Sequence, residues 1–86
     1  MLEGKTTDGF TYEVTDERLD DYEVVKALQA WRGGDWLAFY RLPELLLGTD
    51  GAHQLEAHCQ DENGRVSRKA VAAEILEILD LKPVKN

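Results

Sequence analysis

The sequence has few of the features that mark secreted or membrane proteins. It contains one cysteine, Cys59, so no internal disulfide can form and nothing indicates an oxidising compartment. No apolar run approaches the roughly 20 residues of a membrane span, and the N-terminal residues lack the apolar stretch of a signal peptide. We therefore expect a cytoplasmic protein with no membrane as a partner.

Positive charge is also scarce. Ten lysines and arginines stand against seventeen aspartates and glutamates, which gives a net charge of −7. A chain of this charge repels phosphate backbones at long range, so we expect no nucleic acid as a partner. The 86 residues, of which 43% are apolar, predict one small globular domain with a marginal core.

No motif indicates catalysis. The sequence offers no paired carboxylates, activated nucleophile or glycine-rich phosphate loop, so we expect neither an enzyme nor a cofactor. His53, His58 and Cys59 are the candidates for a metal site. Two histidines five residues apart on a helix point about 140° away from each other, whereas helical zinc pairs use positions i and i+4. We therefore expect no metal site, and we interpret Cys59 as a small core residue.

The pattern of apolar residues predicts a mostly α-helical fold, a small bundle of about four short helices with an N-terminal β arm or hairpin. Alternating apolar and polar residues at 10–14 predict a strand. The predicted boundaries are an extended arm at 1–14, a helical domain at 15–82 and a C-terminal tail at 83–86. We expect the arm to lie against the helices or to wait for a partner, because an isolated hairpin is marginal in water.

Caps and glycines predict the first two helices. Thr15 is a good N-cap for the first helix, and Gly33-Gly34 ends it. Its predicted core face runs along one side, through Leu19, Tyr22, Val25, Leu28 and Trp31. Asp35 can cap the second helix, which Pro43 should kink or divide and Gly48 should end.

The last two helices have similar signals. Thr49 opens the third, whose thin apolar stripe is Ala52, Leu55 and Cys59. Ser67 caps the fourth, whose apolar face is Val71, Ile75, Ile78 and Leu79. The fourth helix should end at Leu81-Lys82-Pro83, because the residue before a proline avoids the helical region.

The second helix supplies the candidate binding surface. Its apolar residues surround nearly the whole helix, and so small a domain cannot bury all of this apolar surface. Our hypothesis is that a partner-binding surface includes Trp36, Phe39, Tyr40 and Leu46. The alternative is that this helix is simply central and covered by its neighbours. The surplus apolar surface is also compatible with a homo-oligomer.

The order of segments resembles that of tail assembly chaperones from long-tailed phages and prophages of Gram-positive hosts. The resemblance covers about residues 15–86. It consists of an acidic first helix, Leu42-Pro43-Glu44-Leu45-Leu46-Leu47-Gly48, then Asp61-Glu62-Asn63-Gly64-Arg65-Val66, then an apolar helix from Val71 to Leu79. It implies a small cytoplasmic protein that shields apolar helices of the tape measure protein during tail assembly, without catalysis.

The resemblance also implies further partners, namely a longer frameshifted form of the chain and the major tail protein. Lys85-Asn86 is compatible with a slippery codon run.

Two alternative functions stay open. A structural head or tail completion protein would use the same apolar surface for permanent assembly. A small helix-turn-helix DNA-binding protein would use the last two helices, although Arg65, Arg68 and Lys69 lie beside acidic residues.

Overall fold

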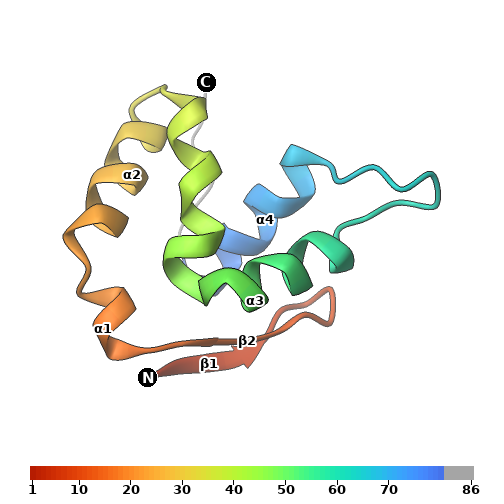
Figure 1. Cartoon of the computed structure of the whole chain (residues 1–86), viewed down its shortest axis with the longest axis horizontal. Helices are drawn as coiled ribbons and strands as arrows, with labels where there is room; N and C mark the ends of the chain where they lie inside the picture. Colours follow the sequence, from red (N-terminus) through yellow and green to blue (C-terminus); the bar gives the residue numbers. More distant parts are fainter. Residues whose placement is uncertain (81–86) are drawn as a thin grey trace.

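A two-stranded hairpin lies across one side of a helical body in the computed structural model, which describes residues 1–80 (Figure 1). The elements are β1 (Leu2–Lys5), β2 (Thr11–Val14), α1 (Asp16–Leu19), α2 (Tyr22–Arg32), the 3-10 helix η1 (Trp36–Arg41), α3 (Leu42–His58) and α4 (Arg68–Ile78). The predicted helical fold with an N-terminal hairpin is confirmed. The predicted helix end at 81–83 and the tail at 83–86 lie outside the described residues.

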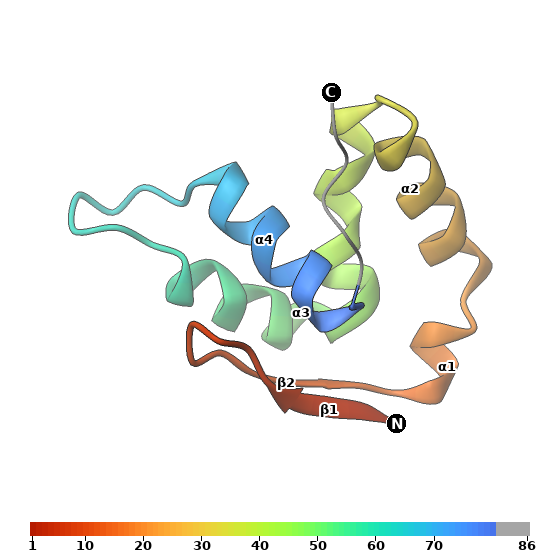
Figure 2. The same ribbon diagram turned by 180° about the vertical axis from the view of Figure 1, so that it is seen from behind.

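The hairpin packs on the protein's own core. Its strands are antiparallel, with Leu2 opposite Val14 and Lys5 opposite Thr11. The alternation seen in the sequence turns Phe10 and Val14 inward, and both side chains are buried. Of the two outcomes expected for the arm, the structure has the one in which it lies against the helices, as seen from both sides in Figures 1 and 2.

The first predicted helix is in fact two helices. Thr15 caps α1 as predicted, accepting a hydrogen bond from the backbone N–H of Arg18 at 3.3 Å. The chain then leaves the helical conformation, and the Asp21 carboxylate caps α2 by accepting from the N–H of Glu23 at 2.8 Å. Aspartate favours caps over the interior of a helix because its side chain can hydrogen-bond nearby backbone N–H groups.

The buried face of the first helical segment differs from the predicted one. The predicted face was wrong for Leu19, Tyr22 and Val25, which are exposed. Val24 and Ala27 are buried instead, and with Leu28 and Trp31 they form one face of α2 at positions i, i+3, i+4 and i+7. The C-terminal part of the prediction holds, since Leu28 and Trp31 pack against the core.

Pro43 and Gly48 divide the next segment as predicted. Residues before Pro43 form the 3-10 helix η1, and Pro43 occupies the first turn of α3, where its missing N–H is not needed. Asp35, however, makes no side-chain cap. Gly48 has φ 78° and breaks α3 into two sections that run in different directions. A glycine is needed there because other residues rarely adopt this conformation.

Arg18 closes the break at Gly48. In a continuous helix the N–H groups of residues 48 and 49 would bond the carbonyls of Glu44 and Leu45. The Arg18 guanidinium donates to these two carbonyls, at 3.3 and 3.1 Å. The Arg18 side chain thereby joins the short helix α1 to α3 through one exposed and one half-buried hydrogen bond.

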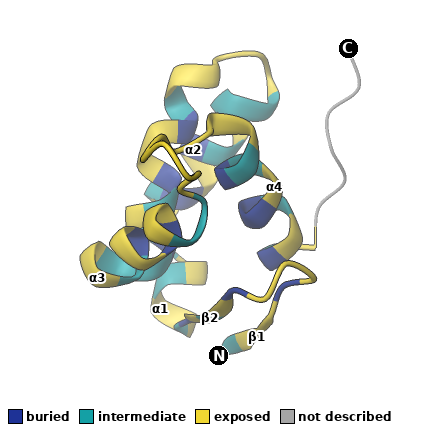
Figure 3. Cartoon of the chain, turned by 90° about the vertical axis from the view of Figure 1, so that its right-hand side faces the viewer, coloured by how far each residue is buried: buried dark blue, intermediate teal, exposed yellow. Residues whose placement is uncertain are grey.

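Helix α4 begins as predicted. The Ser67 hydroxyl accepts a hydrogen bond from the N–H of Ala70 at 3.4 Å. The predicted apolar face is confirmed, and Figure 3 shows its buried positions turned toward the rest of the core. The core as a whole contains Phe10, Val14, Val24, Ala27, Phe39, Leu42, Leu46, Leu55, Val71, Ile75 and Ile78. Within residues 1–80, no helix combines the length and apolar character needed to cross a bilayer.

Candidate functional site

An apolar groove of about 620 Å³ lies between η1, both sections of α3 and the first turn of α4. Three large apolar side chains of η1 stand at it with much of their surface exposed, namely Trp36 (55%), Leu37 (64%) and Tyr40 (86%). The remaining lining residues are Phe39, Pro43, Glu44, Ala52, Glu56, Val66, Arg68 and Val71. Contiguous exposed apolar surface of this kind marks interaction sites in soluble proteins.

The 3-10 helix η1 contributes side chains both to the groove and to the core. Side chains three residues apart eclipse each other in a 3-10 helix, so Leu37 and Tyr40 share one face. Phe39 lies on another face and packs against Trp31, with ring centroids 4.8 Å apart. One short helix therefore supplies both an aromatic core contact and an exposed apolar edge.

The structure divides the predicted binding residues into two pairs. Trp36 and Tyr40 are exposed in the groove. Phe39 and Leu46 are buried in the core, although Phe39 also lines the groove, so their contact with a partner stays a prediction. Leu46 is covered because it lies one α-helical turn after Leu42, on the side of α3 that faces the core.

Sequence reasoning missed Leu37 and Val66 as groove residues. Leu37 lies three residues before Tyr40 and shares its face, but the predicted surface did not include it. Pro43 was the signal that an ordinary helix cannot extend through this segment. Val66 reaches the groove from the α3–α4 connection. Its place depends on the shape of that connection, which no local pattern predicts.

The rim of the groove carries charges of both signs. The Arg68 guanidinium lies over the Trp36 ring, 4.8 Å from its centroid, which is a cation–π distance. Glu44 and Glu56 also line the groove and are exposed. With Arg68 engaged by Trp36, the two carboxylates are the charges best placed to meet a cationic partner residue.

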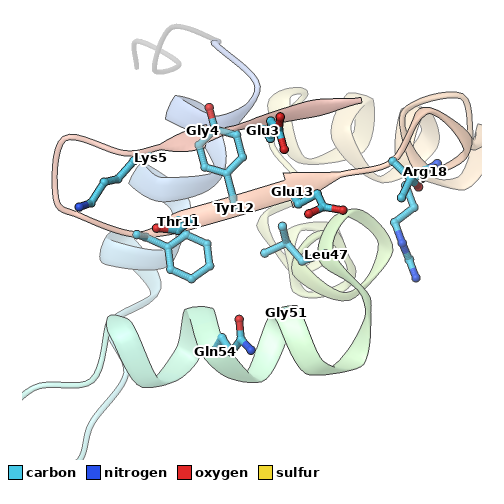
Figure 4. A pocket seen from close by; sticks show the side chains of 12 residues that line it. Glu3, Gly4, Lys5, Thr11, Tyr12, Glu13, Arg18, Leu47, Gly51 and Gln54 are labelled. Carbon is cyan, nitrogen blue, oxygen red and sulfur yellow. Dashed lines mark hydrogen bonds between the residues drawn. The ribbon is translucent and has the colours of Figure 1, made fainter.

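A second hollow, of about 810 Å³, lies between the hairpin and α3. Charged side chains border it, and Figure 4 shows Glu3, Lys5, Glu13 and Arg18 around it. Tyr12 lies across Gly4 of the neighbouring strand rather than standing free (Figure 4). This hollow is larger than the apolar groove, but it lacks exposed large apolar side chains that could anchor a protein partner.

The three sulfur and imidazole side chains considered from the sequence do not converge on one site. His53 is exposed, while His58 is half-buried and contacts Asp8. Cys59 is partly buried against the core, as predicted. Burial raises the pKa of the Cys59 thiol from 9.0 to about 11, and the negative charges of Glu74 and Asp8 add to this rise. The thiol is therefore protonated and unreactive at neutral pH.

The connection between α3 and α4 differs from that of a helix-turn-helix. It runs from Cys59 to Ser67, whereas the DNA-binding motif joins its helices by about three or four residues. The loop projects away from the helical body in Figures 1 and 2. It closes on itself through Asp61, whose carboxylate accepts from the N–H groups of Asn63 and Arg65 at 2.9 Å each.

Comparison of the chain with protein families, with curated proteins and with solved structures gives no match.

Proposed function

We propose that this protein is an adaptor that holds an apolar helix of a partner protein in the groove between η1, α3 and α4. The partner proposed is the tape measure protein of a long-tailed phage, which the chain would shield during tail assembly. The observation that carries the proposal is the exposure of Trp36, Leu37 and Tyr40 at one groove. The class of partner comes from the resemblance of the sequence to tail assembly chaperones.

The size of the exposed surface suits a reversible complex. Burying a fully exposed large apolar side chain contributes about 1.5 to 3 kcal/mol. Trp36, Leu37 and Tyr40 are already partly covered, so each contributes less than this, and the cost of association must be subtracted from their sum. A chaperone has to release its client when the tail tube forms, and a few anchoring side chains favour such release.

The charge of the chain supports the same role. A net charge of −7 keeps a protein in solution while it carries an apolar surface. Glu44 and Glu56 at the groove also favour a client helix with lysine or arginine beside its apolar face. The longer frameshifted form and the major tail protein are further partners in this proposal, which includes no catalytic step.

Co-expression with an apolar helical segment of the tape measure protein tests the proposal. The wild-type chain should keep the segment in the soluble fraction, and Tyr40→Asp should lose this effect. Tyr22→Asp is the matched control, because Tyr22 is a similarly exposed tyrosine (74%) outside the groove. Equal activity of the two variants would contradict the proposed surface.

Purified virions distinguish the proposal from a structural completion protein. A chaperone should be absent from them, whereas a completion protein should be present in a fixed copy number by mass spectrometry. Detection of the chain at stoichiometric amounts would replace the chaperone with a structural subunit.

A further inference from the structure

Three side chains that can bind a metal converge from distant parts of the sequence. Asp8 lies at the tip of the β1–β2 hairpin, His58 is the last residue of α3, and Glu74 lies within α4. The His58 Nε2 atom is 3.2 Å from Asp8 Oδ2 and 3.7 Å from Glu74 Oε1. All three ligand atoms lie within 4.8 Å of one another. Figures 1 and 2 both show the hairpin tip beside the C-terminal section of α3.

Glu74 is the unusual member of this cluster. It is 4% exposed, and its Oε2 atom has no hydrogen-bond partner among the described residues. Buried carboxylates in folded proteins are normally paired, fully hydrogen-bonded or bound to a metal. The other carboxylate oxygen faces His58 at a distance longer than a hydrogen bond. The carboxylate therefore points toward ligand atoms that could share a cation with it.

We propose that Asp8, His58 and Glu74 form a zinc-binding site that joins the hairpin to α3 and α4. Zinc binds imidazole nitrogen and carboxylate oxygen at about 2.0 to 2.2 Å in tetrahedral geometry, which places pairs of ligand atoms about 3.3 to 3.6 Å apart. The two distances from His58 fall close to this range without any change in backbone conformation. Three protein ligands leave the fourth position to water.

The ligand types favour zinc over the lighter divalent cations. Calcium and magnesium prefer ligand sets made only of oxygen atoms, whereas an imidazole among the ligands suits zinc and its neighbours.

The surroundings hold the ligands in place. The Phe10 ring lies 5.4 Å from the imidazole of His58, and Thr7, beside Asp8, donates its hydroxyl proton to Glu77 of α4 at 3.1 Å.

The site was not visible in the sequence because its ligands are far apart along the chain. His53 and His58 were tested as a pair on one helix, and their spacing argued against zinc. In the structure His53 takes no part, and the partners of His58 come from a turn and from another helix.

Isothermal titration calorimetry of the full chain with zinc chloride tests the site. The wild-type chain should bind one zinc ion, and His58→Gln and Glu74→Gln should each weaken binding by at least about tenfold, because even indirect supports of metal sites contribute that much. His53→Gln is the matched control and should bind zinc like the wild type. Binding should also weaken as the pH falls, since protons compete with the metal for the ligands.

Asp8→Asn keeps the test decisive if replacement of buried Glu74 disturbs folding. Asp8 is exposed at the hairpin tip, so its replacement leaves the core unchanged. This variant should also lose at least about tenfold in zinc affinity. The proposal is wrong if the wild-type chain binds no zinc at neutral pH, if Asp8→Asn and His58→Gln bind like the wild type, or if His53→Gln removes the binding. No zinc binding by the wild type would leave His58 as a side-chain contact between Asp8 and Glu74.

Discussion

The guanidinium of Arg68 lies 4.8 Å from the ring centroid of Trp36, which joins the first turn of α4 to the first residue of η1. This contact spans the apolar groove at its rim. It covers part of the Trp36 ring and leaves Tyr40 and Leu37 as the more exposed anchors. The groove therefore has one aromatic ring in contact with Arg68 and two apolar side chains that are more exposed.

Removing the Arg68 side chain should loosen this contact. A cation–π contact at a partly exposed site contributes about 0.5 to 1 kcal/mol, so Arg68→Ala should lower the free energy of unfolding by about this amount. Urea denaturation followed by circular dichroism measures the change. Lys69→Ala, at the next exposed position of α4, should have an effect below about 0.5 kcal/mol. Equal losses in the two variants would mean that the ring contact adds no stability.

Arg18→Ala should destabilise the fold more than loss of an ordinary surface arginine. The Arg18 guanidinium satisfies the carbonyls of Glu44 and Leu45 at the Gly48 break, and these would lose their donor. We expect a loss of about 1 to 2 kcal/mol in the free energy of unfolding. Arg41→Ala is the control, because its 3.9 Å contact with Glu23 is an exposed ion pair worth at most about 1 kcal/mol. A larger effect at Arg41 would contradict the role given to Arg18.

Phe39 and Tyr40 are neighbours with opposite roles, and their alanine variants should differ sharply. Phe39 is buried against Trp31, so Phe39→Ala should cost about 3 to 5 kcal/mol of stability. Tyr40→Ala removes an exposed ring and should change stability by less than about 0.5 kcal/mol. Thermal and urea denaturation of both variants measure the difference. A destabilised Tyr40→Ala protein with an unaffected Phe39→Ala protein would reverse the assignment.

Cys59 should react slowly with iodoacetamide in the folded protein. The thiol pKa of about 11, raised from 9.0, lowers the thiolate fraction at pH 8 by about 100-fold relative to the unfolded chain. Alkylation rates in buffer and in urea, followed by mass spectrometry, measure this difference. Equal rates in the two conditions would show that the folded protein does not protect the thiol.

The same pKa shift predicts how stability changes at high pH. The folded protein holds the Cys59 proton more tightly than the unfolded chain does, so this residue favours folding below about pH 9. That contribution is lost as the pH rises through about 11. Cys59→Ala should lack this part of the pH dependence of the free energy of unfolding. An identical pH dependence in wild type and variant would show that Cys59 does not cause it.

Local signals predicted much of the fold because they act over a few residues. Thr15 and Ser67 cap helices as predicted, and Gly48 breaks one where a left-handed conformation is needed. The role of Asp21 was harder to predict, because an aspartate within an acidic segment is compatible both with an exposed helix surface and with a new N-cap. In the structure Asp21 is the cap of α2, which begins at Tyr22.

The binding surface and the proposed metal site depend on contacts that local patterns do not contain. Phe39 is buried because Trp31 of α2 packs on it, whereas Tyr40 has no such cover. Their sequence neighbourhood is the same, so only the packing of α2 against η1 separates them. The approach of Asp8 to His58 likewise needs the hairpin to fold back over α3.

Mapping a bound client helix by NMR tests the central claim most directly. A peptide covering an apolar helix of the tape measure protein should shift the amide resonances of Trp36, Leu37, Tyr40 and Val66, and leave those around Tyr22 and in the hairpin unchanged. A footprint in the hairpin hollow, or no shift at all in the η1 groove at saturating peptide, would contradict the account.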